Sequence, residues 1–274
     1  MKTSNNIIAL FAFVIIGFSL TSCDKVEAPY KEKIVKPNTE KKVLLEDFTG
    51  HKCVNCPAAH DLAHDLTDAY GEDNLIVVAI HAGFFATPSN GGFEYDFRTE
   101  AGNEYATFYG VQAYPSGMVD QVNVSGNYLL DKDQWGAKVA QQFEEIPQIG
   151  IGITTNLNGN NLSGEIKMDF LTDINQATSL QIWITEDSIV KPQIIPGGED
   201  EAYVHMHVLR AAINGTWGEE LPSANYSAET SETLSFSNYQ LGDDWVPKNL
   251  SLVALVYDNE TKKVIQVERK KIIE

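Results

Sequence analysis

The hydrophobic pattern of this chain changes character once, near Pro147, and that change limits the folds open to it. Before Pro147, apolar runs of strand length alternate with segments whose apolar residues recur at helical spacing. After it, apolar and polar residues alternate along short runs, and no long helical pattern follows. The sequence therefore predicts an α/β domain over residues 43–147 and an all-β domain over residues 148–274.

The α/β half is expected to contain its elements in the order β-α-β-α-β-β-α. The apolar run Leu75–Ile80 is unbroken, as in a strand that is covered on both faces. Asp131, with Gln134 three residues later, forms a variant of the capping box and predicts the start of the last helix. The other elements are predicted as strands at 43–48, 116–119 and 121–124 and as helices at 56–70 and 100–109.

The second half is predicted to contain short strands separated by turns. Asn158-Gly159 is a strong hairpin signal, and residues 258–261 form a second expected turn. Alternating apolar residues predict strands near 149–153, 162–170, 180–184 and 204–208. This pattern predicts an immunoglobulin-like β-sandwich of roughly seven strands.

The N-terminus indicates export. A start with one charge at Lys2, an apolar run over 7–20 and small residues before Cys23 predict a signal peptide over residues 1–22. The run, about 14 residues, is short for a bilayer span. Leu20–Cys23 resembles the lipobox of bacterial lipoproteins, which implies that Cys23 is acylated and anchors the chain to a membrane. An ordinary secreted protein and an uncleaved anchor are the alternatives.

The composition of the mature chain excludes one large class of function. Residues 23–42 are charged and carry proline, as in a tether. Loss of the signal peptide, whose one charged residue is Lys2, changes the formal net charge from −18 to −19. A surface this acidic repels nucleic acid, so we expect no nucleic-acid partner.

The motif with the clearest chemistry is Cys53-Val54-Asn55-Cys56, which follows a strand and opens a helix. Two thiols at this spacing can close a small disulfide. Cys53 is expected to be exposed at the helix tip, where the helix dipole favours a thiolate, with Cys56 one turn inward. His51 and Lys52 would lower the pKa of Cys53 further if their side chains point towards it. A zinc site would need a second pair of ligands, and no cysteine remains once Cys23 is acylated.

Two motifs resemble the thioredoxin superfamily. They are Glu46-Asp47-Phe48 leading into the cysteine motif, and Tyr109-Gly110-Val111 leading to Pro115. The resemblance implies a thioredoxin-like fold for residues 43–147. It also implies that Asp47 is a buried acid that exchanges protons with Cys56, and that Pro115 follows a cis peptide bond and faces the disulfide.

A closer resemblance covers nearly the whole chain. The lipobox, Phe48–Gly50, Cys53–Pro57, Tyr109–Val111 and His205–Arg210 are similar to the twenty-eight-kilodalton outer-membrane lipoprotein family of Bacteroidetes. This resemblance implies a lipid-anchored protein of the cell envelope, at the outer membrane, in which a thioredoxin-like domain is joined to a β-rich one.

Several other features have two readings each. The segment 82–97 is long and aromatic, and it either packs a local core or roofs the disulfide and binds a partner. His60 and His64 lie four apart on the first helix, and His205 and His207 are expected to share one strand face. Either pair could hold a metal, but we expect partly exposed histidines that bind none. Arg210 is expected to be a solvated surface residue, with an ion pair to the other domain as the alternative.

Two functions follow from these features. The first is thiol-disulfide exchange with envelope proteins, as an oxidoreductase that needs no cofactor. In it Cys53 is the nucleophile, Cys56 the resolving thiol, Asp47 the proton acceptor and Pro115 the wall on the substrate side. The second is a surface binding lipoprotein in which the same disulfide is structural.

Overall fold

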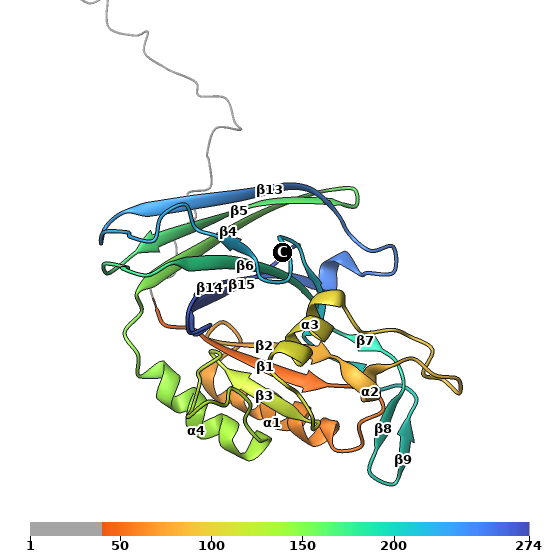
Figure 1. The fold of residues 1–274 in the computed structure, drawn as a ribbon. Helices are drawn as coiled ribbons and strands as arrows, with labels where there is room; N and C mark the ends of the chain where they lie inside the picture. Colours follow the sequence, from red (N-terminus) through yellow and green to blue (C-terminus); the bar gives the residue numbers. More distant parts are fainter. Residues whose placement is uncertain (1–39, 274) are drawn as a thin grey trace, which may run out of the picture. The chain divides into compact units, whose positions relative to one another are not determined.

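The computed structural model describes residues 40–273, all within one compact unit (Figure 1). The predicted signal peptide, Cys23 and most of the predicted tether lie outside the described residues. Within the described part, no helix combines the length and the apolar composition that a membrane span requires. The protein is rich in strands, which form mixed sheets.

The largest sheet takes strands from both sides of Pro147. Its order is β15-β14-β6-β11-β2-β1-β3, with β12 added to β6. The junction is a single pair, Val208 of β11 beside Ala79 of β2. The strands are β1 Val43–Thr49, β2 Leu75–His81, β3 Ser116–Val119, β6 Thr178–Glu186, β11 Val208–Ala212, β12 Glu219–Glu220, β14 Leu250–Asp258 and β15 Val264–Lys271. The expected boundary at 147 falls in the connection before β4 (Ile149–Asn158), and the sheet continues across it.

Helices cover the β1–β2–β3 part of this sheet. α1 (Cys56–Tyr70) and α4 (Lys132–Phe143) pack on one face, and the face behind it receives α3 (Glu100–Phe108). Side chains alternate along β1, so Val43 and Leu45 face α1 and α4 whereas Leu44 and Phe48 face the other core. By the same alternation, Asp47 lies beneath α1.

A second sheet packs on the C-terminal part of the first. It has the order β13-β5-β4, with β13 at Ser231–Gln240 and β5 at Asn161–Phe170. Apolar residues of β4 and β5 meet those of β6 and β14 in one core. This layering is compatible with the expected β-sandwich, although β6 and β14 are buried on both faces because Trp183 and Val253 join the α3 core behind them.

Two small ribbons and two short helices were not expected. β7 (Ile189–Val190) pairs with β10 (Val204–His205), and β8 (Gln193–Ile195) pairs with β9 (Gly198–Asp200). α2 covers Gly83–Ala86, and a 3₁₀ turn covers Pro247–Asn249. Strands of two or three residues show no period, and for this reason the second half holds more strands than the seven expected.

Local predictions were mostly confirmed. The first helix spans Cys56–Tyr70, and Asp131 forms a capping box with Gln134. The expected hairpin is present, with its turn at Gly159-Asn160, one residue after the expected position. The strand expected at 121–124 was wrong, because Asp120 and Gln121 both adopt positive φ and the chain turns there. The apolar residues Val122 and Val124 therefore do not continue a strand.

Candidate functional site

Cys53 and Cys56 form a disulfide at the start of α1, with 5.4 Å between their Cα atoms. Pro57 occupies the first turn of the helix, where its missing N–H is tolerated. The prediction that Cys53 is exposed was wrong: Cys53 is 2% exposed and Cys56 is fully buried. The disulfide is therefore covered in this structure.

The cover comes from the second half of the chain. The side-chain amide of Gln193, at the start of β8, donates to the carbonyl oxygen of Cys53 at 3.0 Å. The backbone N–H of Ile194 donates to the carbonyl oxygen of His51 at 2.9 Å. The hairpin of β8 and β9 is thus tied to the cysteine loop by two hydrogen bonds (Figure 1).

His51 does not supply the positive charge beside Cys53 that the sequence suggested, and Lys52 contacts an aromatic ring. The ring of His51 is buried and stacks on Phe93, with 5.4 Å between ring centroids. Burial lowers the pKa of His51 to about 4, so its ring is neutral at pH 7. The ammonium group of Lys52 lies over the ring of Phe84, 5.5 Å from its centroid.

Asp47 is the most unusual group near the disulfide. It is 1% exposed, and neither carboxylate oxygen makes a hydrogen bond within the described residues. Its Oδ2 lies 3.3 Å from Nε2 of His60, a nitrogen whose hydrogen bond is with the hydroxyl of Thr49 at 2.9 Å. Burial raises the pKa of Asp47 to about 8, so the side chain is mostly neutral at pH 7.

The Tyr114–Pro115 peptide bond is cis, as predicted. The ring of Tyr114 meets Phe85 of α2, with 5.8 Å between centroids. The backbone carbonyl of Phe85 accepts a hydrogen bond from the N–H of Lys52 at 3.0 Å. α2 is therefore in contact with both the cysteine loop and the cis-proline turn.

The segment 82–97 packs a local core, which is the first of its two expected roles. Phe93 and Phe97 are buried in a local core that also holds buried histidines, whereas Phe84 is 78% exposed. Its other end is held by Arg210, which was wrongly expected at the solvated surface. Arg210 donates to the hydroxyl of Tyr95 at 2.6 Å and makes an ion pair with Glu186 at 3.3 Å.

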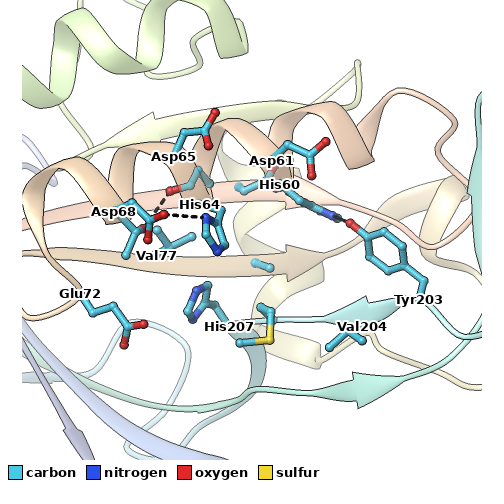
Figure 2. Close-up of a pocket in the computed structure, with 15 residues that line it drawn as sticks. His60, Asp61, His64, Asp65, Asp68, Glu72, Val77, Tyr203, Val204 and His207 are labelled. Atoms are coloured by element: carbon cyan, nitrogen blue, oxygen red, sulfur yellow. Dashed lines mark hydrogen bonds and ion pairs between the residues drawn. The ribbon is translucent and has the colours of Figure 1, made fainter.

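A cavity of about 460 Å³ lies between α1 and residues 203–207 (Figure 2). Nδ1 of His60 and the hydroxyl of Tyr203 lie 2.8 Å apart across one end of it. In Figure 2, His64 and His207 approach from opposite walls. Residues from both halves of the chain line it: Asp47, His60, Asp61, Ala63, His64, Asp65, Thr67, Asp68, Glu72, Val77, Ala79, Tyr203, Val204, Met206 and His207. The histidines could be identified from the sequence, but no sequence pattern predicts the cavity.

The second histidine pair does not share a face. His207 has a positive φ of 56°, which breaks the expected strand between β10 and β11. His205 is consequently buried against Phe97, at 4.5 Å between centroids, whereas Nδ1 of His207 pairs with Asp187 at 2.9 Å. Within residues 40–273, no three His, Cys, Asp or Glu side chains are grouped so that they could hold a metal ion.

We expect Gln193→Ala to speed reduction of the disulfide by dithiothreitol about fivefold, because the lost hydrogen bond contributes about 1 kcal/mol to the closed hairpin. Timed alkylation of the released thiols, read by mass spectrometry, measures the rate. Glu199→Ala, on the exposed strand of the same hairpin, is the matched control. Equal rates in the two variants would show that the hairpin does not limit access.

The disulfide indicates an oxidising compartment, because such bonds are rare in the cytosol. Fold and site together thus define a β-rich, disulfide-bonded protein of the cell envelope. The model of the family described as outer membrane protein Omp28 matches residues 102–274. The chain belongs to this family of outer-membrane lipoproteins, which confirms the resemblance and the location inferred from the sequence.

Two solved structures have a fold similar to that of this chain. HBP35 of Porphyromonas gingivalis is 17% identical, with 86% of this chain and 77% of that chain covered and a TM-score of 0.66. Protein AGR_C_4864 from Agrobacterium tumefaciens is 10% identical, with coverages of 86% and 97% and a TM-score of 0.52. A domain of Omp28 from P. gingivalis is 25% identical, with coverages of 47% and 91% and a TM-score of 0.32. A comparison with curated sequences gave no match.

Proposed function

We propose that this protein exchanges thiols and disulfides with other envelope proteins through Cys53 and Cys56. The observation that carries the proposal is the unpaired, buried carboxyl group of Asp47 beneath the helix that begins with the disulfide. Burying a carboxyl group without a hydrogen-bond donor costs free energy of folding. When a native protein keeps such a group, the group usually has a functional role. A disulfide that only braces the fold has no use for one, whereas a resolving thiol needs a proton acceptor.

In the proposed reaction, Cys53 is the nucleophile and Cys56 resolves the mixed disulfide. Asp47 exchanges the proton of Cys56, and Pro115 forms the wall on the partner's side. Support for these roles comes from the strand–helix–strand order of β1, α1 and β2 and from the cis bond before Pro115. We therefore also propose a thioredoxin-like fold for residues 43–147.

A partner protein would meet an apolar surface around the disulfide. Val54 lies between the two cysteines and is exposed, and Phe84 projects from α2 nearby. Tyr114 lies beside α2 and is partly exposed. Such a surface suits extended protein segments better than small polar thiols. We further propose that acylated Cys23 tethers this surface to the outer membrane.

The shielding of Cys53 favours a second candidate function. Cys53 is 2% exposed, and the β8–β9 hairpin is hydrogen-bonded to it. A disulfide shielded in this way can stabilise the fold of a surface binding lipoprotein without reacting. The two candidates differ in whether the disulfide reacts in cells.

Trapping in cells separates them. In Cys56→Ser, the resolving step is lost, so we expect Cys53 to accumulate mixed disulfides with envelope proteins, visible on non-reducing gels. Cys53→Ser is the matched control, because it removes the proposed nucleophile and should trap no partner. The absence of covalent partners, together with a reduction potential of the wild-type disulfide below about −300 mV, would establish the structural role instead.

A further inference from the structure

The cavity between α1 and residues 203–207 is strongly acidic. It is lined by five carboxyl groups and three histidines, and among its lining residues there is no lysine or arginine. The carboxyl groups belong to Asp47, Asp61, Asp65, Asp68 and Glu72. Three of them lie beside a histidine or an arginine, since His60 lies 3.3 Å from Asp47, His64 lies 3.5 Å from Asp68 and Arg269 lies 3.0 Å from Glu72. Because the whole chain is acidic, the charge alone does not define a site.

Asp47 adds a second and independent feature. It belongs to the lining of the cavity, and it is buried without a hydrogen-bond donor among the described residues. The Nε2 atom of His60, which lies next to Asp47, forms its hydrogen bond with the hydroxyl of Thr49. An acceptor in this state is satisfied by a ligand that brings its own N–H groups.

The remaining lining limits the shape of such a ligand. Ala63, Val77, Ala79, Val204 and Met206 give the cavity apolar walls. The lining residues of α1 run from His60 to Asp68, over about 12 Å at the helical rise. A volume of about 460 Å³ spread along such a wall suits a narrow chain better than a broad ring system.

We propose that this cavity binds an alkylammonium group, a primary ammonium carried on an unbranched aliphatic chain. The ammonium donates hydrogen bonds to Asp47, and the methylene groups pack against the apolar walls. A free diamine and a lysine side chain of a peptide both present this chemistry. The proposal goes beyond thiol exchange and does not depend on it.

Binding of the ammonium group to Asp47 is expected to release a proton. At pH 7 the buried carboxyl group of Asp47 is mostly protonated, since burial raises its pKa to about 8. A neighbouring ammonium favours the carboxylate, so the neutral acid and the cation form an ion pair and release one proton to solvent. His60, Tyr203, His207 and Asp61 are the other titratable groups at this end of the cavity. The pKa of His60 is lowered to about 4, chiefly by burial and then by His207, so His60 stays neutral and does not repel the cation.

Calorimetry on the full-length protein in detergent tests this, with 1,5-diaminopentane as the probe. We expect one site whose affinity rises up to about tenfold per pH unit between pH 6 and 8, with up to one proton released. Titrations in two buffers of different ionisation enthalpy count that proton. In Asp47→Asn, both the pH dependence and the proton release disappear. Asp133→Asn removes one exposed charge from α4 and leaves both unchanged.

A second variant keeps Asp47 intact. Met206 lines the cavity and is exposed. In Met206→Lys, the ammonium group of the new side chain can occupy the site, so we expect the probe no longer to bind. Acetyl-Gly-Lys-Gly-amide then distinguishes the sources: tighter binding than the diamine indicates a peptide lysine, and weaker binding indicates a free amine. The proposal is overturned if pentane-1,5-diol binds equally well, or if the wild type and Asp47→Asn bind the diamine alike without proton release.

Discussion

We expect the free energy of unfolding to be greatest near pH 6.5 and to fall on both sides of it. The acidic side is set by buried histidines. Burial lowers the pKa of His51 and His60 to about 4, that of His205 to about 3 and that of His81 well below its usual value. The unfolded chain takes up these protons below pH 6.5 and the folded chain does not, so stability is lost as the pH falls. Each group contributes about 1.4 kcal/mol per pH unit.

The alkaline side is set by two buried acids of β1. Burial raises the pKa of Glu46 and of Asp47 to about 8. Between their ordinary values and pH 8, the folded chain holds protons that the unfolded chain has released, so stability falls as the pH rises. From pH 4.5 to 6.5 the four histidines outweigh the two acids. Above pH 6.5 the acids act alone, which places the maximum there.

Urea unfolding at pH 4 to 9 and constant ionic strength, followed by tryptophan fluorescence with the disulfide intact, measures this profile. Asp47→Asn should flatten the alkaline side by up to about 1.4 kcal/mol per pH unit. His51→Phe keeps the stacking on Phe93 and should flatten the acidic side by a similar amount. A stability that changes in one direction from pH 5 to 8 would contradict the assignment of these groups.

We expect Arg210→Met to destabilise the protein by about 3–5 kcal/mol, because it leaves the buried carboxylate of Glu186 without its cation. The guanidinium also pairs with Asp244 at 3.2 Å and lies over the ring of Trp245, 5.1 Å from its centroid. Its contact with Tyr95 secures the segment 82–97, so that segment should also become more sensitive to proteolysis.

The double variant Arg210→Met, Glu186→Gln is the matched control for charge. It removes both members of the ion pair, so most of the lost stability should return. Urea unfolding of the two single variants and the double variant gives the coupling energy directly. A loss below about 1 kcal/mol in Arg210→Met would mean that the pair behaves like an exposed one.

The elements with local signals could be predicted from the sequence. The helix Cys56–Tyr70 and the capping box at Asp131 lie where expected, and the β4–β5 hairpin turns one residue later than expected, at Gly159-Asn160. Helical spacing, caps and turn residues act over a few positions, so they can be read directly from the chain. The cis bond before Pro115 and the family were implied by the resemblance of short motifs to known families.

What covers and surrounds these elements depends on contacts between distant parts of the chain. The strand expected to carry His205 and His207 together breaks because the backbone of His207 also pairs with Ala79 of β2, a contact that no local pattern announces. The cover over Cys53 comes from Gln193, 140 residues further along the chain. Contacts between residues so far apart in the sequence depend on how the sheets pack together, and not on the residues next to them in the sequence. The exposure of the disulfide and the existence of the cavity were therefore settled by packing alone.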